Sequence, residues 1–256
     1  MNKKIFSENC NLSSYTTIKV GGVAEYFAEP RSIEEFSYLI KWANLNKQRC
    51  QIIGAGSNLL INNIFIKGLV ICTKKMKSLT IEPYSGIVEA EAGVMLPTLS
   101  NSLAKNGLQG GEWAVGIPGT LGGAIYMNAG TGNLSLAKNL ISVKVINNKT
   151  HEKLEIEKKD INFEYRFSSF QRNDLTIISA RLHFEPNGNL EKLIQTTKNN
   201  LKLKTETQPY HQPSFGSVFK NPENNYAAKL IDDMGLKGFK IGGAEISTMH
   251  SNFIIN

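Results

Sequence analysis

Two glycine-rich stretches in this chain have the composition of anion-binding loops. The first is Gly54-Ala-Gly-Ser-Asn58, and the second is Gly116-Ile-Pro-Gly-Thr-Leu-Gly-Gly-Ala124. Successive backbone N–H groups in a turn or at a helix start form a concave site, and a Cβ atom there would block close approach of a ligand. Two such loops in one chain suggest a dinucleotide held at its pyrophosphate from two sides. A single glycine loop is more often a plain tight turn, so both interpretations stay open at this point.

Neither loop matches the common nucleotide-binding fingerprints. The glycine spacing differs from the Rossmann pattern, and no acidic residue holds the ribose position of a βαβ unit. No lysine stands in the position that a P-loop requires. If a dinucleotide binds, its fold is therefore neither an ordinary Rossmann fold nor a P-loop fold.

Composition narrows the class of protein. With 256 residues, of which 41% are hydrophobic and 20% charged, the chain is an ordinary globular sequence that is long enough for two or three domains. The net charge of +7 favours anionic partners, but the lysines are scattered. Phosphorylated small molecules or a generally basic surface explain this charge as well as nucleic acid does, so we expect no nucleic-acid partner.

Membrane and metal sites are also unexpected. No apolar run has the length of a membrane span, and Met1-Asn-Lys-Lys-Ile-Phe-Ser-Glu8 has no apolar core of a secretory signal. Cys10, Cys50 and Cys72 are odd in number and lack metal-ligand spacing. We therefore expect reduced thiols, no metal and no membrane partner.

The elements that must position the two loops are short strands and helices. Ser32-Ile-Glu-Glu35 is a capping box, and it opens a helix whose apolar residues recur at helical spacing. A second helix begins at Leu96-Pro97 and ends at Gly107. Buried or alternating apolar runs predict strands at residues 50–54, 59–61, 69–72, 88–92, 141–145 and 175–184.

The remainder of the chain predicts a smaller unit. Pro186-Asn-Gly188 is a turn and a plausible boundary, and a helix from Leu190 follows it. Residues 208–214 form a polar loop before a last helix at about 226–234, which Gly235 ends. We find no internal repeat, and the elements lack a regular βαβ alternation, which predicts an α+β protein.

Six motifs follow one another along the chain. They are Tyr15-Thr-Thr-Ile-Lys-Val-Gly-Gly22, Gly54-Ala-Gly-Ser-Asn-Leu-Leu60, the second glycine loop with Met127-Asn-Ala-Gly130, Tyr165-Arg166, Gly216-Ser-Val-Phe-Lys-Asn-Pro222 and His250-Ser-Asn-Phe253. In this order they resemble one family, the UDP-N-acetylenolpyruvoylglucosamine reductases of bacterial peptidoglycan precursor synthesis. The resemblance runs from about Asn11 to the last residue, and the short passage between Arg166 and Ser217 is similar to the family's shorter subtype.

The resemblance implies a fold and a reaction. The fold is α+β, with a two-part FAD-binding unit of the vanillyl-alcohol-oxidase (PCMH) type at residues 1–75 and 76–187, and a smaller α+β substrate domain at 188–256. In the reaction, NADPH reduces non-covalently bound FAD, and the flavin passes hydride to the enolpyruvyl double bond of the UDP-linked amino sugar. The product is UDP-N-acetylmuramate, and we expect a cytoplasmic monomer.

The resemblance also implies roles for individual residues. Arg166 would stabilise the negative charge that hydride addition builds on the substrate carboxylate, and Ser217 would donate a proton to the resulting carbanion. From the residues alone, Tyr-Arg is a packed ring with a solvated cation, and Gly-Ser is a turn. Tyr165, Lys220 and Asn221 would bind substrate. The cofactor-binding residues would be Gly54, Gly56, Ser57, Asn58, Leu59, Gly116, Ile117, Pro118, Gly119, Thr120, Gly122, Gly123, Ala124 and Asn128.

Histidine has no role in this scheme, because the flavin is held without a covalent bond. His151, His183, His211 and His250 are interpreted as surface, strand or loop residues.

The sequence departs from the family pattern at its end. Members of the family continue past the equivalent of Phe253-Ile-Ile-Asn256 for a few tens of residues that carry a catalytic glutamate, and Glu245 does not match it. Two outcomes therefore follow from the sequence: an active reductase, or a C-terminally truncated, catalytically impaired homologue that still binds FAD.

Overall fold

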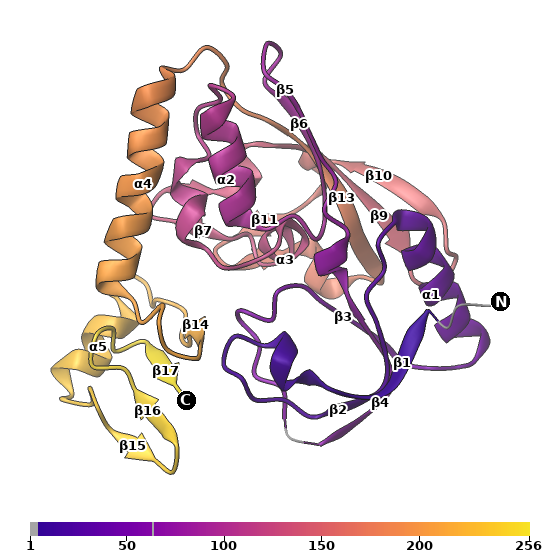
Figure 1. Ribbon diagram of the computed structural model, residues 1–256, viewed down its shortest axis with the longest axis horizontal. Coiled ribbons are helices and arrows are strands. Elements are labelled where there is room, and N and C mark those ends of the chain that lie inside the picture. Colours follow the sequence, from indigo (N-terminus) through magenta and orange to yellow (C-terminus); the bar gives the residue numbers. More distant parts are fainter. Residues whose placement is uncertain (1–4, 63) are drawn as a thin grey trace.

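The computed structural model describes residues 5–62 and 64–256, and Figure 1 shows their arrangement. Residues 1–4 lie outside the described residues. They include the predicted start of the first domain and part of the segment Met1–Glu8, in which no secretory signal is expected. Within the described residues, no helix combines the length and the apolar composition that crossing a bilayer requires.

The first sheet has the strand order β1-β2-β4-β3. Strand β1 is antiparallel to β2, whereas β2 and β3 both run parallel to β4. Helix α1 packs against this sheet, and the elements are β1 (Phe6–Asn11), β2 (Val23–Ala28), α1 (Ile33–Leu45), β3 (Cys50–Ile53) and β4 (Phe65–Cys72).

The predicted capping box at α1 is confirmed in one of its two arms. The Ser32 hydroxyl accepts a hydrogen bond from the Glu35 N–H at 3.2 Å. The Glu35 carboxylate, however, accepts the N–H of Arg31 at 2.7 Å and not that of Ser32. Phe36, Leu39 and other apolar residues of the predicted face are buried, as the helical spacing indicates.

The strand predicted at residues 59–61 is wrong, because these residues form no regular element. Leu59 and Leu60 are 38% and 67% exposed, so their apolar side chains lack the buried face that stabilises a strand. The strand predicted at 69–72 is longer than expected and starts at Phe65. Its central place between β2 and β3 buries the residues from Gly68 to Cys72.

The second sheet is antiparallel and has the order β10-β9-β13-β6-β5. Its inner face packs with α2 and α3 around a core that includes Leu99, Leu121 and Val143. The elements of this segment are β5 (Leu79–Glu82), β6 (Ile87–Glu91), α2 (Leu96–Lys105), α3 (Leu121–Tyr126), β9 (Leu140–Asn147), β10 (Lys153–Glu157) and β13 (Leu175–His183), with the small hairpins β7 (Gly130–Thr131) with β8 (Leu134–Ser135) and β11 (Phe163–Glu164) with β12 (Phe167–Ser168).

The two sheets share a hydrophobic cluster. Ile146 of β9 and Ile178 of β13 pack in the same buried cluster as Phe36 and Leu39 of α1. Burial of this apolar surface holds the first two segments of the chain against one another.

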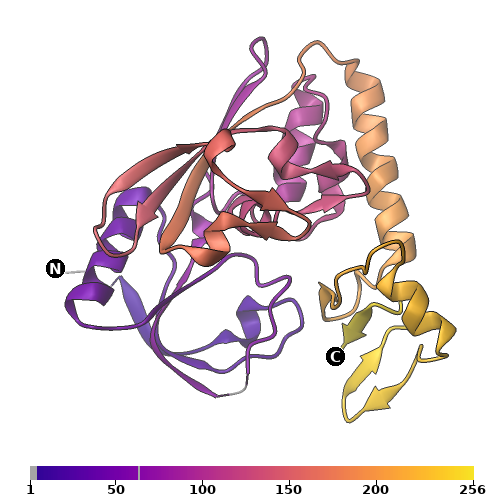
Figure 2. The ribbon, with the colours of Figure 1, turned by 180° about the vertical axis from the view of Figure 1, so that it is seen from behind.

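The third segment forms a separate sheet at the end of a long helix. Figures 1 and 2 show α4 running along the side of the molecule beside α2 and leading to the C-terminal lobe. The sheet has the order β14-β17-β16-β15. The elements are α4 (Leu190–Thr207), β14 (Ser214–Ser217), α5 (Ala227–Asp233), β15 (Lys240–Ile241), β16 (Ala244–Ile246) and β17 (Phe253–Ile255).

The helix ends predicted from glycine are confirmed. Gly107 after α2 has φ +69°, and Gly235 after α5 has φ +68°, a conformation that glycine adopts without a steric penalty. The helix predicted from Leu190 is present as α4, in which Leu193 and Thr197 are buried and Leu201 is 39% exposed. The domain boundaries at 75/76 and 187/188 fall between the three larger sheets and stay a prediction.

Candidate functional site

The structure brings the two glycine loops into contact. A Cβ atom added to Gly54 would lie 2.3 Å from the Thr120 hydroxyl oxygen, and one added to Gly119 would lie 3.7 Å from that of Ser57. The first loop follows β3, and the second leads into α3 with Thr120 as the N-cap. The two loops, which are about sixty residues apart in the sequence, therefore lie side by side in the structure.

The glycines of these loops divide into two groups. Gly54, Gly56, Gly116 and Gly122 are required by packing of the protein itself, since a Cβ at each would come within 3.0 Å of another residue. At Gly56, where φ is +64°, the Cβ would lie 2.0 Å from the carbonyl oxygen of Tyr15.

Gly119 and Gly123 form the second group. The nearest atoms to an added Cβ lie at 3.7 and 3.5 Å, which is ordinary van der Waals distance. Protein packing does not require glycine at these two positions. Their bare backbone leaves room beside the first loop, as a bound cofactor with a pyrophosphate needs.

Asn128 supplies a polar group that the protein leaves without a partner. Its side-chain N–H donates to the carbonyl oxygen of Glu164 at 2.9 Å. Its side-chain oxygen is buried and has no hydrogen-bond partner among the described residues. Because a buried acceptor without a donor costs free energy, this oxygen fits a ligand that offers an N–H or O–H group. The open backbone at Gly119 and Gly123 and this acceptor together fit FAD.

Arg166 lies in the turn between β11 and β12, in a strained conformation. Its φ is +56°, and a non-glycine residue in that region costs about 1–3 kcal/mol. Its guanidinium donates to the carbonyl oxygen of Gly130 at 3.0 Å and lies 5.1 Å from the ring centre of Tyr165. Among the described residues, no carboxylate forms an ion pair with it.

Lys204 of α4 is a second cation near Arg166, and no motif or spacing in the sequence indicates it. Its side-chain carbons pack on Gly116 of the second loop. Burial lowers the pKa of its ammonium group, and the charge of Arg166 lowers it further. Two half-buried cations that repel one another and lack an acidic partner in the described part of the chain favour binding of an anion.

Tyr210 was also missed by sequence reasoning. Its hydroxyl donates to the carbonyl oxygen of Gly116, and burial raises the pKa of this phenol. The polar loop 208–214 therefore closes onto the second glycine loop. No spacing in the sequence indicates this contact, because it joins residues from different lobes.

The substrate residues predicted from the resemblance meet only in part. The N–H of Asn221 donates to the Tyr165 hydroxyl at 3.3 Å. These two residues and Pro222–Tyr226 line an open cavity of about 570 Å³. Lys220 is exposed, and Leu59 and Pro118 of the predicted cofactor set are exposed as well.

Ser217 ends β14 and is exposed, and its strand lies against the first glycine loop. The side-chain amide of Asn58 donates to the carbonyl oxygen of Phe215 at 2.9 Å. It also donates to the carbonyl oxygen of Ser217, at the longer distance of 3.4 Å. Asn58 therefore joins the predicted cofactor loop to the predicted proton donor.

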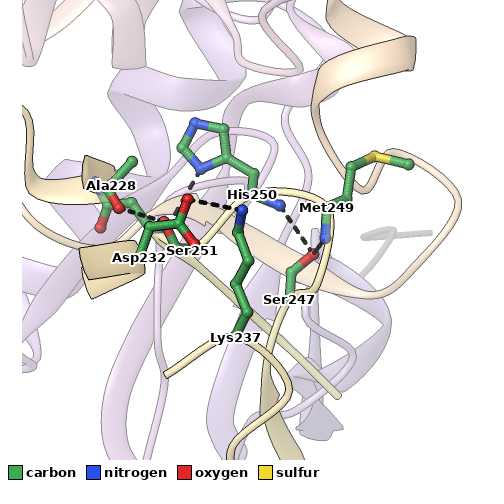
Figure 3. A network of polar contacts seen from close by, with 8 residues as sticks. Ala228, Asp232, Lys237, Ser247, Met249, His250 and Ser251 are labelled. Carbon is green, nitrogen blue, oxygen red and sulfur yellow. Dashed lines mark hydrogen bonds and ion pairs between the residues drawn. The ribbon is translucent and has the colours of Figure 1, made fainter. Parts of the chain in front are cut away.

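The loop that carries the His250–Phe253 motif has a polar network of its own. Figure 3 shows the Ser247 hydroxyl accepting the N–H groups of Met249 and His250, and Ser251 donating to the carbonyl oxygen of Ala228 in α5. An ion pair of Asp232 with Lys237, at 2.9 Å, closes the same network.

His250 is half-buried in this loop. Burial lowers the pKa of its imidazole, and the nearby charges of Lys204 and Lys237 lower it further. The ring nitrogen Nδ1 accepts the N–H of Asn252 at 3.3 Å. The imidazole therefore has a structural contact in the loop where the sequence placed it.

Two family models match parts of this chain. Residues 24–152 match a family model described as an FAD binding domain, and residues 208–256 match the C-terminal domain of UDP-N-acetylenolpyruvoylglucosamine reductase. The chain thus has an α+β FAD-binding fold.

Relatives extend the match over nearly the whole chain. A UDP-N-acetylenolpyruvoylglucosamine reductase of Prochlorococcus marinus subsp. pastoris is 72% identical over 251 residues, which are 98% of this chain and 85% of that protein. One from Prochlorococcus marinus strain NATL2A is 49% identical over 256 residues, covering 100% and 87%. The crystal structure of the enzyme from Thermus caldophilus superposes with a TM-score of 0.83 at 30% identity, covering 98% of this chain and 88% of that one. The chain belongs to the UDP-N-acetylenolpyruvoylglucosamine reductase family.

Proposed function

We propose that this protein reduces UDP-N-acetylenolpyruvoylglucosamine to UDP-N-acetylmuramate with NADPH as hydride donor, in the cytoplasm, as a step of peptidoglycan precursor synthesis. Two observations carry the proposal: the open backbone at Gly119 and Gly123, and the unpartnered side-chain oxygen of Asn128. The Asn128 side chain is hydrogen-bonded to the hairpin that holds Arg166. Bound FAD would supply the chemistry of accepting a hydride from NADPH and delivering it to the terminal carbon of the enolpyruvyl group.

The cations have the first role in this reaction. As hydride adds to the terminal carbon, electrons move toward the substrate carboxylate and its negative charge grows. Arg166 and Lys204 are held by the protein without carboxylate partners among the described residues, so they attract this charge without first losing an ion pair. Preorganised charges of this kind lower the energy of the transition state more than that of the ground state.

Ser217 has the second role. The carbon that carries the ether oxygen must receive a proton, and the Ser217 hydroxyl is the proposed donor. A serine hydroxyl is a weak acid, so it acts on a strongly basic carbanion and must be held close to that carbon. The contacts of Asn58 and Asn252 with the segment around Ser217 restrict its position.

Tyr165, Lys220 and Asn221 are proposed to bind the UDP-linked part of the substrate. Tyr165 and Asn221 line the open cavity of about 570 Å³, which is in the size range of small-molecule sites. We further propose that the protein acts as a monomer and that the segments 1–75, 76–187 and 188–256 are its domains.

The test is an anaerobic absorption experiment on the protein loaded with FAD. NADPH should bleach the flavin absorbance, and UDP-N-acetylenolpyruvoylglucosamine should then restore it. A Ser217→Ala variant should be reduced by NADPH as fast as the unchanged protein, but its colour should return at least a hundredfold more slowly, since general acid catalysis contributes about 10²–10⁴-fold. Bleaching of the unchanged protein without return of colour would identify an FAD-binding homologue without reductase turnover, and return of colour at the normal rate in the variant would remove Ser217 from the mechanism.

A further inference from the structure

The segment Tyr15–Gly22 packs directly on the first glycine loop. The N–H of Thr17 donates to the carbonyl oxygen of Gly56 at 3.2 Å. The close approach of Tyr15 to Gly56 is the reason that position 56 requires glycine. This segment and the loop therefore form one unit.

Thr17 extends from this unit to the strand of Ser217. Its hydroxyl donates to the carbonyl oxygen of Ser214, at the start of β14, at 2.5 Å. Beside it, the carbonyl oxygen of Ile18 accepts the side-chain amide of Asn256 at 3.1 Å. Figures 1 and 2 both show β14 on the side of its sheet that faces the loops of the first sheet.

The pairing of β14 with β17 is irregular just before Ser217. Ser214 pairs with Ile255 and Ser217 with Phe253, so the register shifts between the two pairs. Gly216, between them, has φ +74°. The shift leaves Phe215 and Gly216 outside the regular ladder, so the path of the strand into Ser217 depends on contacts from elsewhere.

After Ser217, those contacts come from Asn252. Its backbone oxygen accepts the N–H of Val218 at 3.0 Å, and its side chain forms two hydrogen bonds of 2.9 Å with the backbone of Phe219. Before Ser217, the contacts come from Thr17, at Ser214, and from Asn58, at Phe215. The strand is thus held at both ends. At its start it is held by the unit that the segment Tyr15–Gly22 forms with the first glycine loop.

We propose that Thr17 is a positioning residue for the proton-transfer step: its hydroxyl holds Ser214 and thereby sets where Ser217 stands relative to the first glycine loop. This rests on the proposed function of Ser217. Reduction of the flavin by NADPH does not use Ser217, so loss of the Thr17 hydroxyl should affect only the half-reaction with substrate. A residue that only stabilises the fold would not separate the two half-reactions.

The experiment compares three variants with the unchanged protein. Thr17→Val keeps the shape of the side chain and removes the hydroxyl, and Thr17→Ser keeps the hydroxyl. Thr176→Val is the matched control, because it removes a similar bond of 2.8 Å, to Asn148, in the second sheet. Rapid anaerobic mixing measures flavin reduction by NADPH and flavin reoxidation by substrate separately.

For Thr17→Val we expect reoxidation to slow by about 10- to 100-fold, since misplacement of a reacting group by about 1 Å can cost 10²-fold. Its reduction by NADPH should stay within about twofold, Thr17→Ser should recover most of the lost rate, and Thr176→Val should change neither rate. Normal reoxidation in Thr17→Val, equal slowing of both half-reactions, or no recovery in Thr17→Ser would overturn the proposal.

A second readout does not depend on turnover. Amide hydrogen exchange at residues 214–218 should become faster in Thr17→Val and stay unchanged in Thr176→Val. If the unchanged protein fails to reoxidise with substrate, the proposed function fails, and the exchange data still decide whether Thr17 holds the strand. Unchanged exchange at 214–218 in Thr17→Val would overturn that part of the inference.

Discussion

Gly119→Ala separates the needs of a cofactor from the needs of protein packing. The added methyl group would lie 3.7 Å from the Ser57 hydroxyl oxygen and 4.0 Å from a methyl carbon of Ile117, so the protein has room for it. Gly119 does not have a positive φ, and alanine can therefore adopt its backbone conformation. Glycine-to-alanine changes at such positions stabilise a protein by about 0.4–1 kcal/mol, because they restrict the unfolded chain.

Stability and FAD affinity should therefore move in opposite directions. For a chain of this length, a gain of up to about 1 kcal/mol raises the Tm of the FAD-free protein by up to about 4 °C. If FAD occupies the space beside Gly119, the methyl group overpacks the site at a cost of about 1–3 kcal/mol. Since 1.4 kcal/mol is tenfold, the Kd for FAD should rise by about 5- to 150-fold.

Two further glycines calibrate the result. Gly56→Ala combines a positive φ with a contact of 2.0 Å to the backbone of Tyr15, and should lower the Tm of the FAD-free protein by about 5 °C or more. Gly132→Ala has a positive φ of +56° with no atom within 4 Å, and isolates the conformational cost. The assays are thermal unfolding of the FAD-free proteins and titration with FAD followed by quenching of flavin fluorescence. An unchanged Kd in Gly119→Ala, or a loss of Tm equal to that of Gly56→Ala, would refute the reasoning.

Two other predictions concern stability. Tyr210→Phe removes the hydroxyl that donates to Gly116, and should cost about 1 kcal/mol and lower the Tm by about 2–4 °C; an unchanged Tm would show that this contact contributes nothing. Burial lowers the pKa of His250 below its usual 6.5. At a pH below 6.5 the unfolded chain therefore binds more protons than the folded one, and the free energy of unfolding decreases as the pH falls. His250→Gln should therefore lose less stability than the unchanged protein between pH 7 and pH 5 in urea unfolding, and an equal loss in both would contradict the assignment.

Local signals in the sequence were sufficient for most elements. The Ser32 cap, the glycines after α2 and α5 and the alternation of Val88 with Ala90 act over a few residues, so each could be recognised without the fold. The failure at residues 59–61 has the same basis: an apolar run predicts a strand only if a neighbouring element buries it, and Leu59 and Leu60 have none that does so.

The sequence by itself determined the family, through the order of its motifs, and the positions of the two glycine loops. It could not separate Gly56, which must be glycine because Tyr15 lies against it, from Gly119, which has open space beside it. Only the tertiary structure decided this, because the difference depends on which atoms the fold brings near each glycine.

The contacts between the third segment and the first two also could not be predicted from the sequence. Thr17 and Ser214 are 197 positions apart, and Tyr210 and Gly116 are 94 apart. No periodicity or spacing rule connects residues so distant, since such rules describe neighbours on one helix or strand. The place of Ser217 beside the first glycine loop, and of Lys204 beside Arg166, follows from the packing of the third segment on the first two.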